Sequence, residues 1–454
     1  MTKTLLFAVV VIALLICQPN QSANAQPANA QPANAQPANA QKDDYLAAAK
    51  QAAGWIQSAA VKTDKGTTWP ADPLNPKSVN NSLYSGTPGV VLFFLEAYKT
   101  TGNQLYLKTA RDGADYLLAS LDDEKGTGLY EGLAGISFTL LETFKATKDE
   151  KYRQGARRSI ELISSKARPI GKGVDWNGVN DIISGSAGTG LFLLYAAREL
   201  KDPAALELAA KAGLRLIELG RAEAGGLKWA MDGKFPRLMP NFSHGTAGVA
   251  YFLATLYQQT KRKEFLDAAL AGAKYLLAVA DKENNGCQIF HHEPDGEKLF
   301  YLSWCHGPTG TARLFYRLSQ ITGDKTWMEW VKRSARSVMT SGIPENQTPG
   351  FWNNVSQCCG SAGVAEFFLS LHRVTRNAEY LQFAKRLTSS LLAKASPEQA
   401  GLKWIQAEHR SQPKLLIAQT GYMQGAAGIG MWLLRLHAFE TGKRSFITFP
   451  DSPF

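Results

Sequence analysis

Runs of apolar residues return along the chain at intervals, and each run follows a glycine-x-x-glycine tetrapeptide. A run such as VVLFFLEAY or TGLFLLYAA is apolar on nearly every face, which predicts a helix that is buried on all sides. One such tetrapeptide carries little information, but several in the same register predict an internal repeat. The seven tetrapeptides begin at Gly86, Gly132, Gly185, Gly245, Gly307, Gly360 and Gly425.

A second and more polar set of helices is predicted between these runs. Segments such as YLKTARDGADYLL and YLQFAKRLTSSLL carry apolar residues three or four positions apart, which is typical of a helix that buries one face. The first of them, DYLAAAKQAAGWI, precedes the first glycine pair. We therefore predict seven outer helices alternating with seven inner helices, with an outer helix first.

The two terminal inner runs indicate that the repeats form a closed ring. An open stack of repeats needs polar capping units at its ends. Here the first and last inner runs, VVLFFLEAY and MWLLRLHAF, are as apolar as the middle ones. The sequence thus predicts an all-α fold, an (α/α)7 toroid or barrel, with all inner helices starting at one end. We expect the glycines to allow close backbone approach and positive φ angles there.

The N-terminal region has the features of an export signal followed by a spacer. Residues 1–25 combine Lys3, an apolar run too short to span a bilayer, and small residues near Ala25, which predicts a signal peptide. The QPANA repeats within residues 26–42 predict a disordered spacer, so the toroid domain is expected over residues 43–454. We therefore expect an exported protein, located in the periplasm, outside the cell or on its outer surface. A lipid anchor at Cys17 is the less favoured alternative.

Composition and charge narrow the choice of partners. The 454 residues are 45% hydrophobic, enough for a large core, and the formal net charge is +11. No block of five or six like charges occurs, so a nucleic-acid partner is not indicated. The basic excess favours an anionic partner or envelope surface. After residue 25 no stretch is apolar enough for an integral membrane span, and we expect a monomer.

Candidate chemistry is concentrated just before the glycine pairs. Of five cysteines, three stand at the starts of two successive inner helices: Cys305, Cys358 and Cys359. His244 and Asp181 precede the glycine pairs of the fourth and third repeats. Three thiolates, or two with a histidine, suit a tetrahedral zinc site with one open position. A substrate thiol in that position would be kept deprotonated near neutral pH.

Simpler interpretations exist for each of these residues. Cysteines of an exported protein often pair, so Cys305 could form a disulfide with Cys358 or Cys359, or Cys287 with any of them. The position of the three cysteines at successive helix starts favours a metal over a bridge. His244 could be a hydrogen-bonded core residue, Asp181 a helix-start residue, and His306 a ligand, an acid or part of a loop. His291 and His292 are expected to be exposed loop residues.

The glycine pairs and two short motifs resemble those of the lanthionine synthetase C-like family. The motifs are Trp-Cys-His-Gly at 304–307 and Ser-His-Gly at 243–245, and the resemblance covers about residues 43 to 440. It implies an (α/α)7 toroid that adds a cysteine thiol to dehydroalanine or dehydrobutyrine with the help of Zn²⁺. The implied ligands are Cys305, Cys358 and Cys359, the last standing where the family has histidine. A third thiolate should make a bound substrate thiolate more nucleophilic.

The same resemblance implies roles for residues outside the metal site. His244 corresponds to the acid/base histidine that protonates the enolate, and Asp181 to its partner. Trp304 matches the family and is expected to pack beside the site. Many lantibiotic cyclases have an arginine four residues before the first cysteine ligand, where this chain has Tyr301.

Three functions remain open at this stage. The first is zinc-dependent, lanthionine cyclase-like addition of a thiol to a dehydroamino acid or similar electrophile, on a peptide or small substrate. The second is a carbohydrate-active toroid that acts on envelope glycans, for which Asp175, Asp232 and Glu408 and several tryptophans are candidates, although they form no obvious carboxylate pair. The third is a non-catalytic toroid that binds a peptide.

Overall fold

The computed structural model describes residues 38–233 and 238–454. The expected signal peptide, Cys17 and residues 26–37 of the expected spacer lie outside the described residues. Helix α1 begins at Ala38, within the last residues of the stretch that the sequence predicts to be a spacer. Alanine and glutamine favour helix, which allows the first helix to extend in the N-terminal direction. No helix of the described residues combines the length and apolar character that a bilayer span requires.

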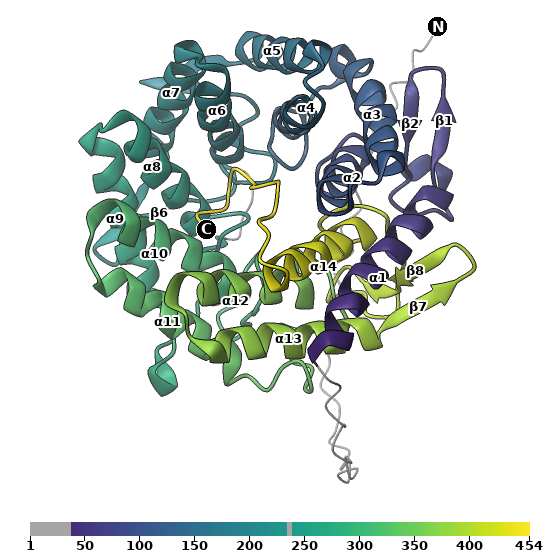
Figure 1. Cartoon of the computed structure of the whole chain (residues 1–454). Helices are drawn as coiled ribbons and strands as arrows, with labels where there is room; N and C mark the ends of the chain where they lie inside the picture. Colours follow the sequence, from purple (N-terminus) through teal and green to yellow (C-terminus); the bar gives the residue numbers. More distant parts are fainter. Residues whose placement is uncertain (1–37, 234–237) are drawn as a thin grey trace, which may run out of the picture.

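Fourteen α-helices in the described residues form two concentric rings, which confirms the predicted all-α toroid (Figure 1). The outer helices are α1 (Ala38–Ser58), α3 (Gln104–Leu118), α5 (Glu150–Ser165), α7 (Pro203–Leu219), α9 (Lys263–Val279), α11 (Thr326–Met339) and α13 (Ala378–Ala393). The inner helices are α2 (Thr87–Thr101), α4 (Leu133–Thr147), α6 (Ser186–Leu200), α8 (Thr246–Thr260), α10 (Pro308–Thr322), α12 (Ser361–Thr375) and α14 (Ala426–Glu440).

Each inner helix packs along the outer helix that follows it, and the last pair closes the ring. Helix α14 has no outer helix after it and packs along α1, the first helix of the chain. Figure 1 shows these two helices side by side. The apolar face of the last inner helix is thus covered by the opposite end of the chain, which removes the need for capping repeats.

Short turns join each inner helix to its outer partner, and local capping explains them. Lys148 ends α4 in the left-handed conformation, with φ of 60°, and Asp149 begins α5 by accepting a hydrogen bond from Lys151 N. Between α2 and α3, Gly102 ends α2 in the left-handed conformation, and Asn103 begins α3 by accepting a hydrogen bond from Leu105 N. A left-handed residue followed by an Asp or Asn cap satisfies backbone groups at both helix ends, so the turn can be short.

The glycine pairs are required by close packing more than by unusual backbone angles. A Cβ on the second glycine of the fifth pair, Gly310, would lie 1.9 Å from the Trp304 carbonyl oxygen, and one on Gly363 would lie 2.0 Å from that of Gln357. Among the first glycines of the pairs, Gly132 alone has a positive φ, 146°. The expectation of close approach is therefore met, whereas the expectation of positive φ angles is wrong for the other six.

A closed circle of backbone hydrogen bonds links the segments just before the glycine pairs. In every repeat, the amide of a residue two or three positions before the pair donates to the corresponding segment of the next repeat. The donors and acceptors are Tyr84 to Tyr130, Tyr130 to Ile183, Ile182 to Ser243, Ser243 to Cys305, Cys305 to Cys358, Cys358 to Met423 and Met423 to Tyr84. This circle fixes the relative register of all seven segments, which form the mouth of the ring.

Small antiparallel hairpins follow several outer helices. They are β1 (Val61–Thr63) with β2 (Gly66–Thr68), β3 (Arg168–Ile170) with β4 (Gly173–Asp175), β5 (Arg221–Glu223) with β6 (Gly226–Lys228), β7 (Ala395–Glu398) with β8 (Gly401–Trp404), and β9 (Gln406–Ala407) with β10 (Leu416–Ile417). Trp176, Trp229 and Trp404 end or follow three of them and donate Nε1–H to carbonyls of the preceding outer helix. These buried tryptophans anchor hairpins, so they cannot serve as exposed platforms for glycans.

Candidate metal centre

The three candidate cysteine ligands occupy equivalent positions at the mouth of the ring. Cys305 and Cys358 each stand two residues before a glycine pair, and Cys359 stands one residue before. The Cys305 amide donates to the Cys358 carbonyl at 3.3 Å, so the backbone circle holds the two segments side by side. Helices α10 and α12 begin directly after them, which fixes the direction of both segments.

The three sulfur atoms form a compact cluster. Cys305 Sγ lies 3.4 Å from Cys359 Sγ, Cys359 Sγ lies 3.3 Å from Cys358 Sγ, and all three lie within 4.8 Å of one another. These separations exceed the ~2.05 Å of a disulfide bond. Cys287 and the three clustered cysteines are free thiols, so no disulfide joins the cysteines within the described residues.

The cluster fits a tetrahedral zinc ion. Zinc–sulfur bonds of ~2.3 Å place tetrahedral ligands ~3.8 Å apart, close to the sulfur separations observed here. All three residues are at least nine-tenths buried, yet they line a cavity of about 360 Å³ that also contains His244 and Tyr301. The three thiols could therefore hold the ion while its fourth position faces the cavity.

The thiols differ in their acidity. Burial raises the pKa of Cys305, but hydrogen bonds from Cys358 and Cys359 and the charge of His306 outweigh it and hold this pKa well below its usual value. Burial and the Cys305 thiolate raise the pKa of Cys358, and hydrogen bonds to the other two thiols raise that of Cys359. Cys305 is therefore the thiol of the cluster whose surroundings most favour ionisation.

His244 and Asp181 form a hydrogen-bonded pair beside the cysteines. His244 Nδ1 lies 2.6 Å from Asp181 Oδ2, and the histidine side chain is 29% exposed while the aspartate is 1% exposed. Burial lowers the pKa of His244, but its hydrogen bond with Asp181 and the negative charges of Asp181 and Cys305 outweigh this and raise it overall. Because Nδ1 is occupied, Nε2 is the nitrogen left for the cavity.

The backbone of the third repeat holds the Asp181 carboxylate in place. Its other oxygen, Oδ1, accepts hydrogen bonds from the amides of Ser184 and Gly185 at the start of α6. Glu131, in the second repeat, also lines the cavity, and burial together with the charge of Asp181 raises its pKa. Asp181 is therefore both a helix-start residue and the partner of His244, so the two interpretations of this residue hold together.

A cluster of histidines covers one wall of the cavity, which corrects an expectation from the sequence. His291 and His292 are not exposed: His292 is 8% exposed and His291 is partly buried. The His291 ring lies 4.1 Å from that of His306 and 4.4 Å from that of Tyr301, measured between centroids. The loop that carries the two histidines packs against the mouth segment of the fifth repeat, a contact that local sequence does not encode.

His306 is buried with little hydrogen bonding. Its Nε2 lies 3.5 Å from Ser243 Oγ, and its Nδ1 has no hydrogen-bond partner in the described structure. Burial lowers the pKa of His306 to about 4, with smaller effects of neighbouring His244 and His292. Burial and the charge of His306 likewise lower the pKa of His291 to about 2. Burial therefore disfavours the charged form of both rings.

An arginine from the seventh repeat reaches the cavity on the side of Tyr301. The loop between β9 and β10 carries Glu408 and Arg410, both of which line the cavity. Burial and the Cys305 charge raise the pKa of Tyr301, while a hydrogen bond with Arg410 opposes this. Arg410 is the one arginine or lysine that lines this cavity among the described residues. Arg410 therefore brings a positive charge to the cavity, although position 301 is a tyrosine.

Several lining residues were missed by the sequence analysis, and the repeat register could have revealed some of them. Tyr84, Glu131 and Gln424 stand one or two positions before a glycine pair, as His244 and the cysteines do, and all line the cavity. Aligning the seven segments on their glycines would therefore have identified them. His291 and Arg410 lie far from any glycine pair in sequence, so no such signal exists for them.

The sequence matches the lanthionine synthetase C-like protein family over residues 77–447. The fold is similar to that of nisin cyclase, with a TM-score of 0.61, 17% identity, and coverage of 91% of this chain and 97% of the other. The fold is also similar to that of an inactive variant of an alpha-1,6-mannanase of Salegentibacter sp., with a TM-score of 0.50, 14% identity, and coverage of 87% of this chain and 99% of the other. An unsaturated glucuronyl hydrolase specific for heparin has a TM-score of 0.51, 14% identity, and coverage of 89% of this chain and 100% of the other. At these identities the structural similarities show a shared toroid fold.

Proposed function

The chain belongs to the lanthionine synthetase C-like family, and on that premise we propose that it catalyses zinc-dependent addition of a thiol to a dehydroamino acid or a similar electrophile. The observation that carries the proposal is the position of the cysteine cluster and the His244–Asp181 pair in one cavity. Thiol addition needs a deprotonated sulfur nucleophile and an acid that protonates the carbon next to the carbonyl group.

Cys305, Cys358 and Cys359 would hold the zinc ion. A bound zinc ion lowers the pKa of an incoming thiol, so that the thiol is a thiolate near neutral pH. The cavity of about 360 Å³ is large enough for a few side chains of a peptide or for a small molecule. Its wall of neutral aromatic rings, His291, Tyr301 and Trp352, gives an electrophile an apolar surface against which it can be oriented.

His244 supplies the proton. When the substrate sulfur bonds to the β-carbon of the electrophile, the electrons of the carbon–carbon double bond move to the carbonyl oxygen and form an enolate. His244 Nε2 then donates its proton to the α-carbon, and the proton released by the thiol restores that of His244 through solvent. The raised pKa of His244 favours the protonated form of the donor, and Asp181 fixes the orientation of the ring.

Arg410 is the group best placed to stabilise the enolate oxygen. Arg410 lines the cavity together with Tyr301 and His244, and its interaction with Tyr301 opposes the rise that burial causes in the pKa of that tyrosine. A positive charge where negative charge develops in the transition state is among the strongest contributions a site can make. In this chain the positive charge would be that of Arg410 in the β9–β10 loop, because position 301 is a tyrosine and not an arginine.

The glycan-directed alternative receives less support from the site. Of the three candidate acids, Asp175 forms an ion pair with Arg168 at 2.7 Å. Among the described residues, Glu408 is the one candidate acid that lines the cavity. Glu408 accepts a hydrogen bond from Gln419 at 2.7 Å. What favours this alternative is the fold shared with a mannanase and a glucuronyl hydrolase, a scaffold that can host different chemistries.

The test is metal content combined with thioether formation. The full-length protein should contain zinc, and it should consume the thiol of a peptide that carries one cysteine and one dehydroalanine. Cys305→Ala should abolish both zinc binding and thiol consumption, whereas Cys287→Ala, which removes a buried cysteine outside the cluster, should keep both. A native protein without zinc, or a Cys305→Ala variant with full activity, would contradict the proposal. Peptide binding without turnover in the wild type would support the binding-module alternative.

A further inference from the structure

The C-terminal tail, residues 445–454, turns back from α14 into the centre of the ring (Figure 1). Five of the seven inner helices contact it. Glu96 of α2 accepts hydrogen bonds from the amides of Phe446 and Ile447, and Arg435 of α14 donates to the Ile447 carbonyl. Phe449 packs 5.4 Å from Phe138 of α4, measured between ring centroids. The remaining contacts come from Arg313 and Tyr316 of α10 and from Phe367 of α12.

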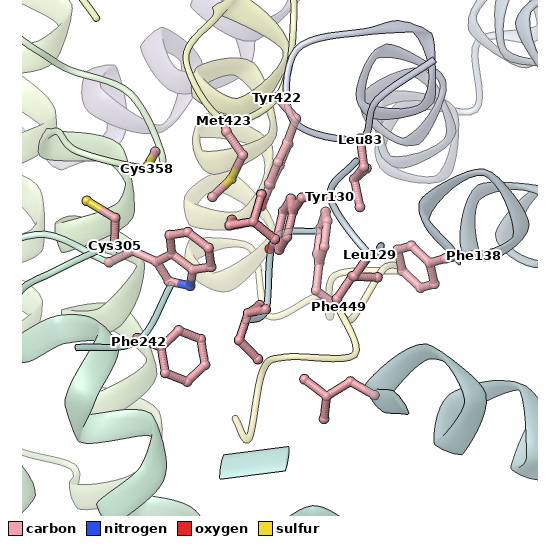
Figure 2. Close-up of a cluster of buried hydrophobic side chains, with 14 of the residues drawn as sticks. Leu83, Leu129, Tyr130, Phe138, Phe242, Cys305, Cys358, Tyr422, Met423 and Phe449 are labelled. Carbon is pink, nitrogen blue, oxygen red and sulfur yellow. The ribbon is translucent and has the colours of Figure 1, made fainter. Parts of the chain in front are cut away.

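The tail reaches the layer of side chains that lies behind the cysteine cluster. Figure 2 shows Phe449 and Cys305 as members of one cluster of buried side chains, with Tyr130 and Tyr422 between them. The Phe449 ring stacks on that of Tyr422 with centroids 4.6 Å apart. The match to the family covers residues 77–447, so Phe449 and the residues after it follow the matched range.

Asp451 is the polar contact between the tail and the site. It is 1% exposed, and its Oδ2 accepts a hydrogen bond from Trp304 Nε1 at 3.2 Å and one from Arg313 Nη1 at 3.1 Å. Arg313 also donates to the Asp451 backbone carbonyl. Burial raises the pKa of Asp451, and the charge of Arg313 opposes this.

The two partners of Asp451 lie on either side of Cys305 in the chain. Trp304 immediately precedes Cys305, and Arg313 lies in the second turn of α10, the helix that begins after Gly307. The Trp304 indole is 3% exposed and is flanked by the rings of Tyr130 and Phe242. The Asp451 carboxylate therefore accepts hydrogen bonds both from the residue just before Cys305 and from the helix that follows Cys305.

We propose that Asp451 is a positioning residue for the metal centre, which acts through Trp304 to hold Cys305 Sγ against Cys358 and Cys359. The inference rests on the proposed role of the cysteines as zinc ligands. Loss of the carboxylate would leave the partly buried Arg313 guanidinium and the buried Trp304 N–H without their charged acceptor, so the Trp304–Cys305 segment would gain freedom. Groups that orient metal ligands typically change metal affinity when they are removed.

The experiment compares three single variants of the full-length protein and the double variant Asp451→Asn/Trp304→Phe. Asp451→Asn keeps the shape of the side chain but removes its charge, and Trp304→Phe removes the donor. Glu96→Gln is the matched control, since Glu96 is a buried carboxylate that holds the same tail but does not contact Trp304. Thermal unfolding identifies variants that are merely less stable. Zinc affinity is measured by chelator competition, and the geometry of the site by the absorption spectrum of the cobalt-substituted protein.

We expect Asp451→Asn and Trp304→Phe each to weaken zinc binding by about tenfold and to shift the cobalt–thiolate bands, with the double variant no weaker than the stronger single one. Glu96→Gln should leave affinity and spectrum unchanged even if it lowers the unfolding temperature. Wild-type affinity and spectrum in Asp451→Asn would overturn the inference.

The alkylation rate of Cys305 in the metal-free protein separates this inference from the proposed function. If the wild type binds no zinc, the proposed function fails. A faster alkylation of Cys305 in Asp451→Asn, but not in Glu96→Gln, would still support the positioning of Cys305 by the tail. Equal rates in all variants would refute it.

Discussion

The mouth of the ring and its tail-filled centre both bury polar side chains, but the two regions combine them differently. In the centre, opposite charges meet: Arg435 forms an ion pair with Glu366, and Arg313 forms one with Asp451. At the mouth, the His244–Asp181 pair lies beside groups of the same kind, with three thiols within 4.8 Å of one another and the His291 and His306 rings 4.1 Å apart.

This difference indicates what each region contributes. Opposite charges that pair satisfy one another, so they hold a segment in place without help from a ligand. Like groups that gather in a buried site shift one another's pKa values, an arrangement that is characteristic of functional sites. The centre should therefore govern stability, and the mouth should govern chemistry, and substitutions in the two regions should have different consequences.

The largest effect is expected for the acid at the mouth. His244→Asn should slow thioether formation by about 10² to 10⁴-fold, because it removes the proton donor, while zinc content and unfolding temperature stay unchanged. Arg410→Met should slow it in the same assay by a smaller factor. His409→Asn, on an exposed histidine of the same cavity rim, is the control and should retain full activity. Loss of zinc from His244→Asn would show that this histidine supports the metal site instead.

A substitution at the centre should have the opposite profile. Arg435→Met leaves Glu366 without its ionic partner and removes the hydrogen bond to the Ile447 carbonyl, so the free energy of unfolding should fall by about 3 kcal/mol. Zinc content per folded chain should not change. Urea unfolding measures the effect, with the exposed Arg198→Met as the control. A change below about 1 kcal/mol would mean that the central ion pair adds little beyond what packing provides.

The smallest effect concerns His306 and pH. The pKa of His306 is about 4 in the folded protein, below the ~6.5 of an unfolded histidine, so the unfolded chain binds the proton first on acidification. The stability linked to this group is complete above pH ~6.5 and is lost as pH falls toward 4, with a slope of up to ~1.4 kcal/mol per pH unit. His306→Phe should flatten this slope and change stability near neutral pH by less than ~1 kcal/mol.

Urea unfolding across this pH range, with a chelator present so that metal release does not contribute, measures the slope. His409→Asn should keep the wild-type slope, because His409 is exposed at the rim. A slope in His306→Phe equal to that of the wild type would assign the acid sensitivity to other groups.

Much of the fold and part of the site followed from the sequence. The seven glycine pairs and the apolar runs after them identified the inner helices, because burial on all faces leaves a local pattern in composition. The same register identified Cys305, Cys358, Cys359 and His244 as site candidates. Each stands one or two positions before a glycine pair, and this position alone places a residue at the mouth of the ring. Export, and the domain boundaries before Ala38, remain predictions.

Tertiary structure alone decided which of these residues meet. Asp181 and His244 are 63 residues apart in the chain, and only the closed circle of mouth segments brings their side chains within 2.6 Å. His291, Arg410 and the tail residue Asp451 reach the site from loops and from the chain end, where no repeat sets their position. A local pattern specifies how a segment folds and which face it buries. The contacts between distant segments depend on how seven repeats close around one axis, which no single segment encodes.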